Sequence, residues 1–398
     1  MWDRLFDHMM RGFVSVGRLD VTLADGQTRS YAGAPGPEVA MQFHTSDLPR
    51  KLVLTTDMAV GEGYMNGDLT LAGDDLRGFF AFLAMNADRS DHLWWRRSAH
   101  HVRKARRRFD QWNPAHRARE NVAHHYDLSA RLYDLFLDED RQYSCAYFTH
   151  PDLSLEDAQT AKKAHIAKKL CLEPGMRVFE IGCGWGGLAL SLARDYGVEV
   201  LGVTLSTEQH AWATERARAE GLSDKVRFEL RDYRAVTGQF DRIVSVGMFE
   251  HVGVPHYREY FDTVRDRLTD TGVALIHTIG RVAPPGTTSP WITKYIFPGG
   301  YVPALSEMLE AVEKSGLYQT DIEVWRLHYA ETLKHWLTRF EAQSDAAAAL
   351  YDDRFVRMWR YYLAASEMTF RHGRQCVFQV QLARNQEAVP LTRAYIEE

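Results

Sequence analysis

Cysteine is scarce in this chain, and long hydrophobic runs are missing. The 398 residues include only four cysteines, and none stands in a Cys-x-x-Cys pair or at zinc-ligand spacing from a histidine. These observations exclude a disulfide scaffold, and we expect reduced thiols and no metal site. No apolar run reaches the length of roughly 18 residues that a transmembrane helix requires, and the first residues lack the basic head and apolar core of a secretory signal. We therefore expect a cytoplasmic protein that does not span a membrane.

An excess of charge of one sign is also missing. The formal net charge is -5, with 25% charged and 45% hydrophobic residues, which is typical of a globular protein and gives no overall attraction to nucleic acid. One segment is an exception, because residues 96–108 carry seven Lys or Arg and no acid, shortly after Trp94 and Trp95. This pattern fits two interpretations, a solvated linker between domains or a contact with an anionic surface such as lipid head groups.

Length and hydrophobic patterning predict three segments. At roughly 150 residues per domain, a chain of this length is expected to form two or three domains. Residues 1–90 combine strand-like runs at 14–23 and 39–44, separated by a turn-rich stretch, with helical patterns from 48 onward. They predict a small α+β domain, which we expect to engage lipid or to mediate dimerisation. Residues 91–118 are interpreted as a basic linker, and residues 119–398 as a larger domain.

Strands and helices alternate through the larger domain. The expected strands are residues 177–181, 198–203, 225–230, 240–246, 272–279, 318–325 and 375–383. Helical patterns separate most of these runs. Because such alternation places parallel strands in one sheet with helices on both faces, it predicts a doubly wound α/β fold.

A glycine-rich turn after the first of these strands carries the strongest chemical signal. Residues 178–187 read Val-Phe-Glu-Ile-Gly-Cys-Gly-Trp-Gly-Gly, and such a turn lets a ligand approach the backbone and the free N–H groups of a helix start. The spacing of Gly182, Gly184 and Gly187 also fits a dinucleotide site. That site requires an acidic residue near the end of the next strand, where this chain has hydroxyls and then Gln209. A nicotinamide cofactor is therefore disfavoured, and Glu180 is placed to meet a cationic or hydroxyl-bearing group.

This turn and six further motifs resemble those of cyclopropane-fatty-acid synthases and mycolic-acid cyclopropane synthases, which are S-adenosylmethionine-dependent methyltransferases. The matching motifs are residues 125–127, 143–148, 180–187, 202–209, 248–253, 275–280 and 291–300. The resemblance extends from about residue 121 to the end, and residues 61–68 resemble part of the smaller domain of full-length members. It implies a seven-strand doubly wound methyltransferase sheet whose last strand is antiparallel, with a smaller N-terminal α+β domain.

The resemblance also implies two groups of site residues. The group implied to bind the cofactor comprises Tyr143, Ser144, Glu180, Gly182, Gly184, Gly186, Thr204, Ser206, Gln209, Asp232 and Tyr233. The catalytic group, implied to hold bicarbonate as a base, comprises Cys145, Glu250, His277, the backbone of Ile279, and Tyr329. The assignment of Tyr329 rests on the shortest of the motif matches. The remaining candidates are interpreted as structural, namely His251, Cys171, Cys183 and Cys376.

The chemistry of this family explains these residue types. An unactivated alkene is a poor nucleophile and a sulfonium methyl is a strong electrophile, so holding the two in line supplies much of the rate. The attack leaves a carbocation, and a base must remove a proton from the transferred methyl so that a ring closes. Aromatic side chains stabilise such a cation, and the candidates are Phe249, Trp291, Tyr295, Phe297 and Tyr301.

We therefore expect an enzyme that transfers a methylene unit from S-adenosylmethionine to the cis double bond of an unsaturated phospholipid acyl chain, with bicarbonate as the base. It is expected to be a homodimer, attached peripherally to the inner face of the membrane. A fatty-acyl C-methyltransferase with a methyl- or methylene-branched product is the alternative within the family. A nicotinamide-dependent dehydrogenase and a non-catalytic lipid-binding protein are the alternatives outside it.

Overall fold

The computed structural model describes residues 1–87 and 128–397 of the chain. The basic segment at 96–108, the two tryptophans before it and the motif at 125–127 lie outside the described residues. The chain divides into two compact units. The first comprises Met1–Ala105, Thr288–Ile296 and Leu333–Arg374, and the second comprises Arg106–Thr287, Phe297–Thr332 and Gln375–Glu398. Each unit is described by itself.

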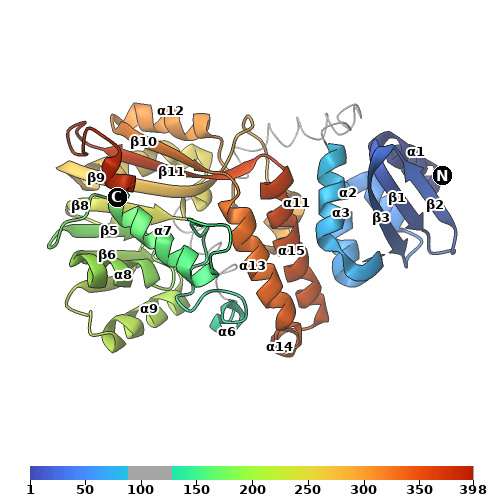
Figure 1. The fold of residues 1–398 in the computed structure, drawn as a ribbon, viewed down its shortest axis with the longest axis horizontal. Coiled ribbons are helices and arrows are strands. Elements are labelled where there is room, and N and C mark those ends of the chain that lie inside the picture. Colours follow the sequence, from blue (N-terminus) through green and yellow to red (C-terminus); the bar gives the residue numbers. More distant parts are fainter. Residues whose placement is uncertain (88–127, 398) are drawn as a thin grey trace. The chain divides into compact units, whose positions relative to one another are not determined.

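A seven-stranded sheet forms the centre of the second unit. Its strands are β5 (Arg177–Ile181), β6 (Glu199–Thr204), β7 (Val226–Leu230), β8 (Phe240–Val246), β9 (Leu268–Arg281), β10 (Tyr318–Trp325) and β11 (Gln375–Ala383). They lie side by side in the order β10-β11-β9-β8-β5-β6-β7 (Figure 1). Strand β11 runs antiparallel to both of its neighbours, whereas β9, β8, β5, β6 and β7 are mutually parallel. The predicted seven-strand methyltransferase sheet with an antiparallel last strand is confirmed.

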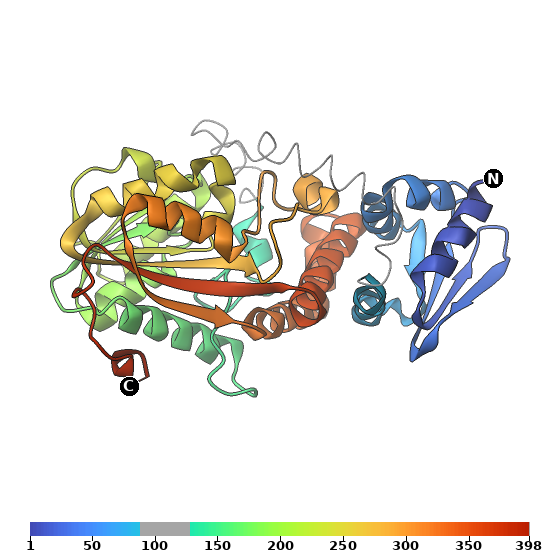
Figure 2. The same cartoon turned by 90° about the horizontal axis from the view of Figure 1, so that it is seen from above.

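Helices cover both faces of this sheet. The covering helices are α7 (Leu155–Lys169), α8 (Gly187–Tyr196), α9 (Thr207–Ala219), α10 (Tyr257–Arg267) and α12 (Leu305–Ser315). The unit also contains α6 (Ala130–Tyr133), the start of α13 (His328–Ala342) and α16 (Ala394–Glu397). Figure 2 shows α12 in orange on one side of the sheet and α7 in green on the other.

The alternation of side chains along the strands explains why both faces are covered. Phe179 and Ile243 pack into the core beneath α10 and α12, whereas their neighbours Val178 and Val244 pack into the core beneath α7, α8 and α9. Successive strand residues point to opposite faces, so a strand that is apolar at both positions needs a helix layer on each side.

The order of the strands determines where a ligand site is expected. The chain passes from β5 to β6 and β7 on one side, and then returns to place β8 on the other side of β5. In such sheets the loops at the carboxyl ends of the strands diverge at this reversal and leave a crevice. Ile181 and Val246 end β5 and β8 at that point.

The first unit contains a second, smaller sheet. Its strands are β1 (Val16–Thr22), β2 (Thr28–Ala32), β3 (Ala34–Phe43) and β4 (Leu69–Leu71), in the order β2-β1-β3-β4. Strand β2 and the beginning of β3 occupy the stretch that the sequence analysis interpreted as rich in turns. The helices are α1 (Trp2–Phe13), α2 (Leu48–Asn66), α3 (Leu76–Ala87), α11 (Pro290–Tyr295), α14 (Ser344–Leu350), α15 (Asp353–His372) and the rest of α13. Among the described residues, this unit also has a short 3-10 turn at Ala72–Asp74. The second unit has three such turns, at Tyr233–Ala235, Phe249–His251 and Val254–His256.

Buried polar and aromatic contacts hold the first unit together. The fully buried Asn86 accepts the backbone N–H groups of Ser15 and Val16, at 2.8 and 3.0 Å, and so ties α3 to β1. The indole N–H of Trp291 donates to the sulfur of Met65 at 3.2 Å, which joins α11 to α2. Helix α15 packs on α2 and α3. Segments from the second half of the chain therefore belong to the first unit.

This division differs from the boundaries predicted at residues 90 and 119. The sequence pattern of α15 shows that one of its faces is apolar, but it does not show which partner covers that face. Among the described residues, no helix is both long enough and apolar enough to cross a bilayer.

Candidate active site

The glycine-rich turn joins β5 to α8 at the reversal of strand order. Gly182 has φ +84°, and a Cβ there would lie 2.9 Å from the Cβ of Met248. Gly186 has φ +83° at the start of α8, and a Cβ there would lie 2.8 Å from that of Ala213. Both the left-handed backbone and the close packing require glycine. The turn therefore brings the free N–H groups of the α8 start to the edge of the sheet.

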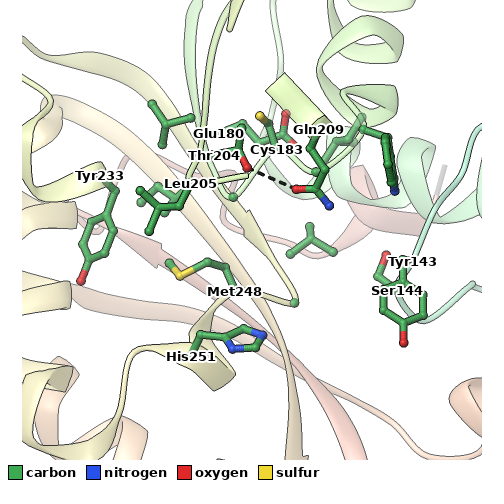
Figure 3. A pocket seen from close by; sticks show the side chains of 18 of the residues that line it. Tyr143, Ser144, Glu180, Cys183, Thr204, Leu205, Gln209, Tyr233, Met248 and His251 are labelled. Carbon is green, nitrogen blue, oxygen red and sulfur yellow. Dashed lines mark hydrogen bonds between the residues drawn. The ribbon is translucent and has the colours of Figure 1, made fainter. Parts of the chain in front are cut away.

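A cavity of about 170 Å³ opens beside this turn (Figure 3). It is lined by nine of the predicted cofactor residues, namely Tyr143, Ser144, Glu180, Gly182, Gly184, Thr204, Gln209, Asp232 and Tyr233. Gly186 and Ser206 do not line it. Gly186 packs against α9, and the Ser206 hydroxyl accepts the backbone N–H of Gln209 at 3.3 Å at the start of α9. These two residues shape the walls without facing the cavity.

The end of β6 offers amide and hydroxyl groups to the cavity. The Thr204 hydroxyl donates to the side-chain oxygen of Gln209 at 3.2 Å (Figure 3), which leaves the amide nitrogen of Gln209 as a donor. Beyond the next strand, Asp232 accepts two hydrogen bonds from the Arg234 guanidinium, at 2.8 and 2.7 Å. No carboxylate stands where a dinucleotide site would place one on β6.

Glu180 brings a buried carboxyl group to the same cavity. Glu180 is 3% exposed, and its Oε2 atom has no hydrogen-bond partner among the described residues. Burial raises the pKa of Glu180 to about 8, although the nearby Lys162 ammonium acts in the opposite direction. A cationic ligand beside this oxygen would favour the ionised form.

Lys162, on α7, is a buried cation that the sequence analysis missed. Its ammonium group donates to the Ser144 hydroxyl at 2.8 Å and to the side-chain oxygen of Gln142 at 2.7 Å. The residue is fully buried, and burial lowers its pKa to about 8 while Asp138 opposes the shift. A lysine on an amphipathic helix usually lies in solvent, so nothing in the local sequence signals this position.

Glu250 and Ile279 are the two predicted catalytic residues that touch each other. Glu250 follows β8, and its Oε1 accepts the backbone N–H of Ile279 on β9 at 2.6 Å. Its Oε2 is buried without a hydrogen-bond partner among the described residues. Burial raises the pKa of Glu250 to about 7, and the hydrogen bond from Ile279 acts against this shift. The Ile279 amide is thus already engaged, and its contact orients Glu250.

The other three predicted catalytic residues, His277, Cys145 and Tyr329, are all buried. His277 is buried on β9, where the side-chain nitrogen of Gln379 lies 3.1 Å from its Nδ1. Burial and nearby lysines lower the pKa of His277 well below its ordinary value, so the ring is neutral. If the amide N–H donates to Nδ1, the proton of the ring lies on Nε2 and is available as a donor.

Cys145 lies in the segment between α6 and α7 that also carries Tyr143 and Ser144. Its thiol is fully buried and donates to the carbonyl of Ala146 at 3.4 Å, and burial raises its pKa above the ordinary value. The backbone N–H of Ala146 donates to Thr332 at 3.0 Å. Thr332 lies on α13, the helix whose first turn carries the buried Tyr329.

None of the five predicted catalytic residues lines the cavity itself. Met248 and His251, on either side of Glu250 in the sequence, do line it. Cys183 lines it as well, so two residues that the sequence analysis interpreted as structural face the cavity. His251 comes directly after Glu250 at the same sheet edge.

Two aromatic residues expected to stabilise the carbocation, Phe249 and Trp291, do not line the cavity. Phe249 is fully buried, and its ring meets those of Tyr257, Tyr260 and Phe261 in the core of the second unit. Trp291 packs against α2 in the first unit. Aromatic composition alone does not distinguish a core residue from the wall of a binding site.

Comparison with known proteins decides which class of enzyme this site belongs to. The family model described as mycolic acid cyclopropane synthetase matches residues 114–380. The chain belongs to this family. It is an S-adenosylmethionine-dependent methyltransferase of the cyclopropane-fatty-acyl-phospholipid synthase type.

Two curated relatives and one solved structure illustrate the similarity. The chain is 38% identical to a probable fatty acid methyltransferase of Pseudomonas putida, over 85% of either chain. It is 46% identical to cyclopropane-fatty-acyl-phospholipid synthase of Escherichia coli K12, over 66% of this chain and 67% of that one. The crystal structure of mycolic acid cyclopropane synthase CmaA1 complexed with SAH and CTAB is 33% identical, with a TM-score of 0.64, over 69% of this chain and all of that one.

Proposed function

We propose that this enzyme transfers a methylene unit from S-adenosylmethionine to the cis double bond of an unsaturated phospholipid acyl chain and forms a cyclopropane ring. The observation that carries the proposal is the turn at residues 248–251. Met248 and His251 line the cofactor cavity, and Glu250 between them is a buried carboxyl group with one unpartnered oxygen. A site for a proton acceptor thus adjoins the site of the methyl donor.

The reaction requires a base next to the methyl donor. The alkene carbon attacks the methyl group, a carbon–carbon bond forms, and the carbon–sulfur bond breaks with its electron pair going to sulfur. The carbocation that remains closes to a ring when a proton leaves the transferred methyl. A base placed within hydrogen-bond reach of that proton is therefore required.

We propose bicarbonate as the group that binds beside Glu250. The residues present fit it, because Glu250 with a pKa near 7 is partly protonated and can donate to an anion through its unpartnered oxygen. The neutral His277 can donate through Nε2, and the Cys145 thiol and the Tyr329 hydroxyl are the further candidates. Bicarbonate, when bound, supplies the base. Ile279 contributes by orienting Glu250 through its N–H.

A methyl- or methylene-branched product remains the second candidate, because one relative is named a probable fatty acid methyltransferase. The two outcomes share the methyl transfer and differ in the fate of the carbocation. Loss of a proton from the transferred methyl closes the ring directly. A 1,2-hydride shift that first moves the positive charge to the methyl-bearing carbon lets the same proton loss give a methylene, whereas a methyl branch requires hydride from a separate two-electron reductant.

Lipid analysis of cells that express the enzyme tests both proposals. A ring or a methylene branch adds one carbon and two hydrogens to an acyl chain, whereas a reduced methyl branch adds two hydrogens more. Proton NMR of the purified lipid then separates the ring, whose protons are strongly shielded, from the vinylic methylene. Cells that express the Glu250→Gln variant provide the matched control. Unchanged acyl chains in the presence of active cofactor turnover would contradict a lipid substrate.

We further propose that the enzyme docks on the membrane surface through residues 96–108 and acts as a homodimer. Each Lys or Arg near an anionic surface contributes about 1 kcal/mol, and the effect is screened by salt. Changing Arg106, Arg107 and Arg108 together to Ala should reduce cosedimentation with anionic vesicles at low salt and leave cofactor affinity unchanged. Equal cosedimentation of the two proteins would contradict docking through this segment, and light scattering checks the dimer.

A further inference from the structure

Arg141 is a cationic side chain in the lining of the cofactor cavity that no motif of the sequence singled out. It lies between α6 and α7, two residues before Tyr143, and has φ +52°. This left-handed conformation is uncommon for a residue with a side chain and costs energy unless its surroundings hold it. The side chain is only 9% exposed. Something in the local structure therefore compensates for both the backbone and the burial.

Two neighbours fix the guanidinium group in one orientation. Its Nε and Nη2 atoms donate to the two carboxylate oxygens of Asp134, at 2.6 and 2.8 Å. Its centre lies 3.7 Å from the ring centroid of Trp212 and 5.1 Å from that of Trp185. A bidentate carboxylate pair and a stacked indole use the planar shape of arginine, which lysine does not have.

One nitrogen of this guanidinium group is left over. The Nη1 atom is buried and has no hydrogen-bond partner among the described residues. A buried donor of a charged group that lacks an acceptor is costly, and native sites usually satisfy it with protein, water or a ligand. Because Asp134 and the two tryptophans hold the rest of the group, Nη1 is a pre-oriented donor on a residue that lines the cavity.

The same cavity contains an unsatisfied group of the opposite charge. Glu180 also lines it, and its buried Oε2 has no hydrogen-bond partner in the part of the chain that the structure describes. By contrast, Asp232 and Arg234 satisfy each other through two hydrogen bonds. Figure 3 places Tyr233 on one side of the cavity and Tyr143 with Ser144 on the opposite side.

We propose that Arg141 binds the α-carboxylate of the methionyl end of S-adenosylmethionine through Nη1, while Glu180 faces the α-ammonium group. The methionyl end carries one carboxylate and one ammonium group, and the wall of the cavity offers one donor and one acceptor for them. Asp134 and Trp212 act as positioning residues for the guanidinium group. The proposal rests on the cofactor alone and is independent of the lipid product.

Binding of two ligands that differ only in this carboxylate tests the proposal. Calorimetry would compare S-adenosylhomocysteine with its decarboxylated analogue, which keeps the adenosine, the sulfur and the ammonium group. The Arg141→Met variant should lose about tenfold to a hundredfold in affinity for S-adenosylhomocysteine, since a hydrogen bond to a charged group has that worth. Its affinity for the analogue should stay within about twofold of the wild type.

The Arg234→Met variant is the matched control, because Arg234 lines the same cavity but is paired with Asp232. It should change the affinities for both ligands by the same factor. An equal loss for both ligands in Arg141→Met, or no loss for either, would overturn the proposal. A wild-type protein that binds neither ligand would instead contradict the use of S-adenosylmethionine.

A second variant keeps the test usable if Arg141→Met does not fold. The Asp134 side chain is 47% exposed and does not line the cavity. Asp134→Asn therefore leaves the guanidinium group of Arg141 in place but weakens the hydrogen bonds that orient it. We expect a severalfold loss for S-adenosylhomocysteine and none for the analogue. A loss of the same size for both ligands would again overturn the assignment.

Discussion

The carboxylate of Glu250 accepts the backbone N–H of Ile279 at 2.6 Å, and this contact ties the turn after β8 to the neighbouring strand β9. One oxygen of the carboxyl group is thereby fixed, and the other points to no protein partner among the described residues. A flexible acidic side chain has become a rigid group with one free position. Such pre-organisation is what a site for proton transfer requires.

Glu250→Gln should therefore slow product formation by about a hundredfold or more, because the amide can still donate to bicarbonate but cannot take up the proton that bicarbonate removes, and loss of a positioned acid–base group typically costs two to four orders of magnitude. The amide is nearly isosteric and can still accept the N–H of Ile279 through its oxygen, so the fold and the affinity for S-adenosylhomocysteine should change little. Product formation measured with saturating cofactor, together with calorimetry, checks both expectations. Glu313→Gln, at an exposed position on α12, is the control. Wild-type turnover of Glu250→Gln would remove this residue from the reaction.

Cofactor affinity should depend on pH through Glu180. Burial raises the pKa of this carboxyl group to about 8, so the carboxyl is mostly protonated at neutral pH in the absence of ligand. The α-ammonium group of the cofactor favours the ionised form, and binding must then release the proton. Affinity should consequently rise about fivefold between pH 7 and pH 8, and level off above the pKa.

Two variants test the origin of this dependence. Glu180→Gln should bind more weakly and lose most of the pH dependence in this range, and any remainder reports Lys162, whose pKa is also about 8. Lys162→Met removes a cation that lowers the pKa of Glu180, so the pH at which binding rises should move upward. Calorimetry in buffers of different ionisation heat would also count the released proton. If the cofactor affinity of the wild type does not change between about pH 6.5 and pH 8.5, Glu180 is not the group that titrates.

A substitution at Gly184 can distinguish an effect on ligand binding from an effect on folding. Its φ is +50°, and a Cβ there would meet no protein atom within 4 Å although the residue lines the cavity. Gly184→Val should therefore place its branched side chain in the space of the cofactor and abolish binding. Gly221→Val is the matched control, because φ is +68° there, the Cβ would also meet nothing, and the residue is not in the cavity lining.

Both of these variants should lose about 1–2 kcal/mol of unfolding free energy from the left-handed backbone, and only Gly184→Val should lose the cofactor. Denaturant unfolding and equilibrium binding measure the two effects. Normal binding by Gly184→Val would show that the cofactor does not approach this part of the turn.

Packing in the first unit can be tested with two helical glycines. A Cβ at Gly61 on α2 would lie 2.4 Å from ring atoms of Trp291, whereas a Cβ at Gly12 on α1 would meet nothing within 4 Å. Gly61→Ala should lower the free energy of unfolding by about 1–3 kcal/mol through overpacking. Gly12→Ala should leave it unchanged or raise it by up to about 1 kcal/mol, because alanine favours the helix. The opposite order in denaturant unfolding would contradict the contact between α11 and α2.

A deletion of the N-terminal residues is a poor test of what the first unit does. Helix α15, from the second half of the chain, packs on α2 and α3, so removal of residues 1–90 would expose its apolar face. Point variants on the surface of this unit are the better way to examine its proposed role in lipid engagement or dimer contacts.

The larger sheet could be predicted strand by strand because its signals are local. Four of the seven expected strands, at 177–181, 240–246, 318–325 and 375–383, have the predicted bounds. Those at 177–181, 240–246 and 375–383 are short apolar runs that are buried on both faces, whereas the edge strand at 318–325 is mostly exposed or half-buried. The start of β9 at Leu268 and the strand β2 were missed, since their residues alternate weakly and form strands only by pairing with neighbours.

The sequence by itself determined the glycine-rich turn, the absence of an acid after β6 and the motifs around Glu250 and His277, because these depend on residue type and spacing along the chain. Only the tertiary structure decided that Lys162 is buried, that Arg141 keeps a free nitrogen, and that α15 packs with the N-terminal helices. Burial and pairing are properties of residues that lie far apart in the sequence, and the same lysine or arginine is solvated or functional according to which distant side chains surround it.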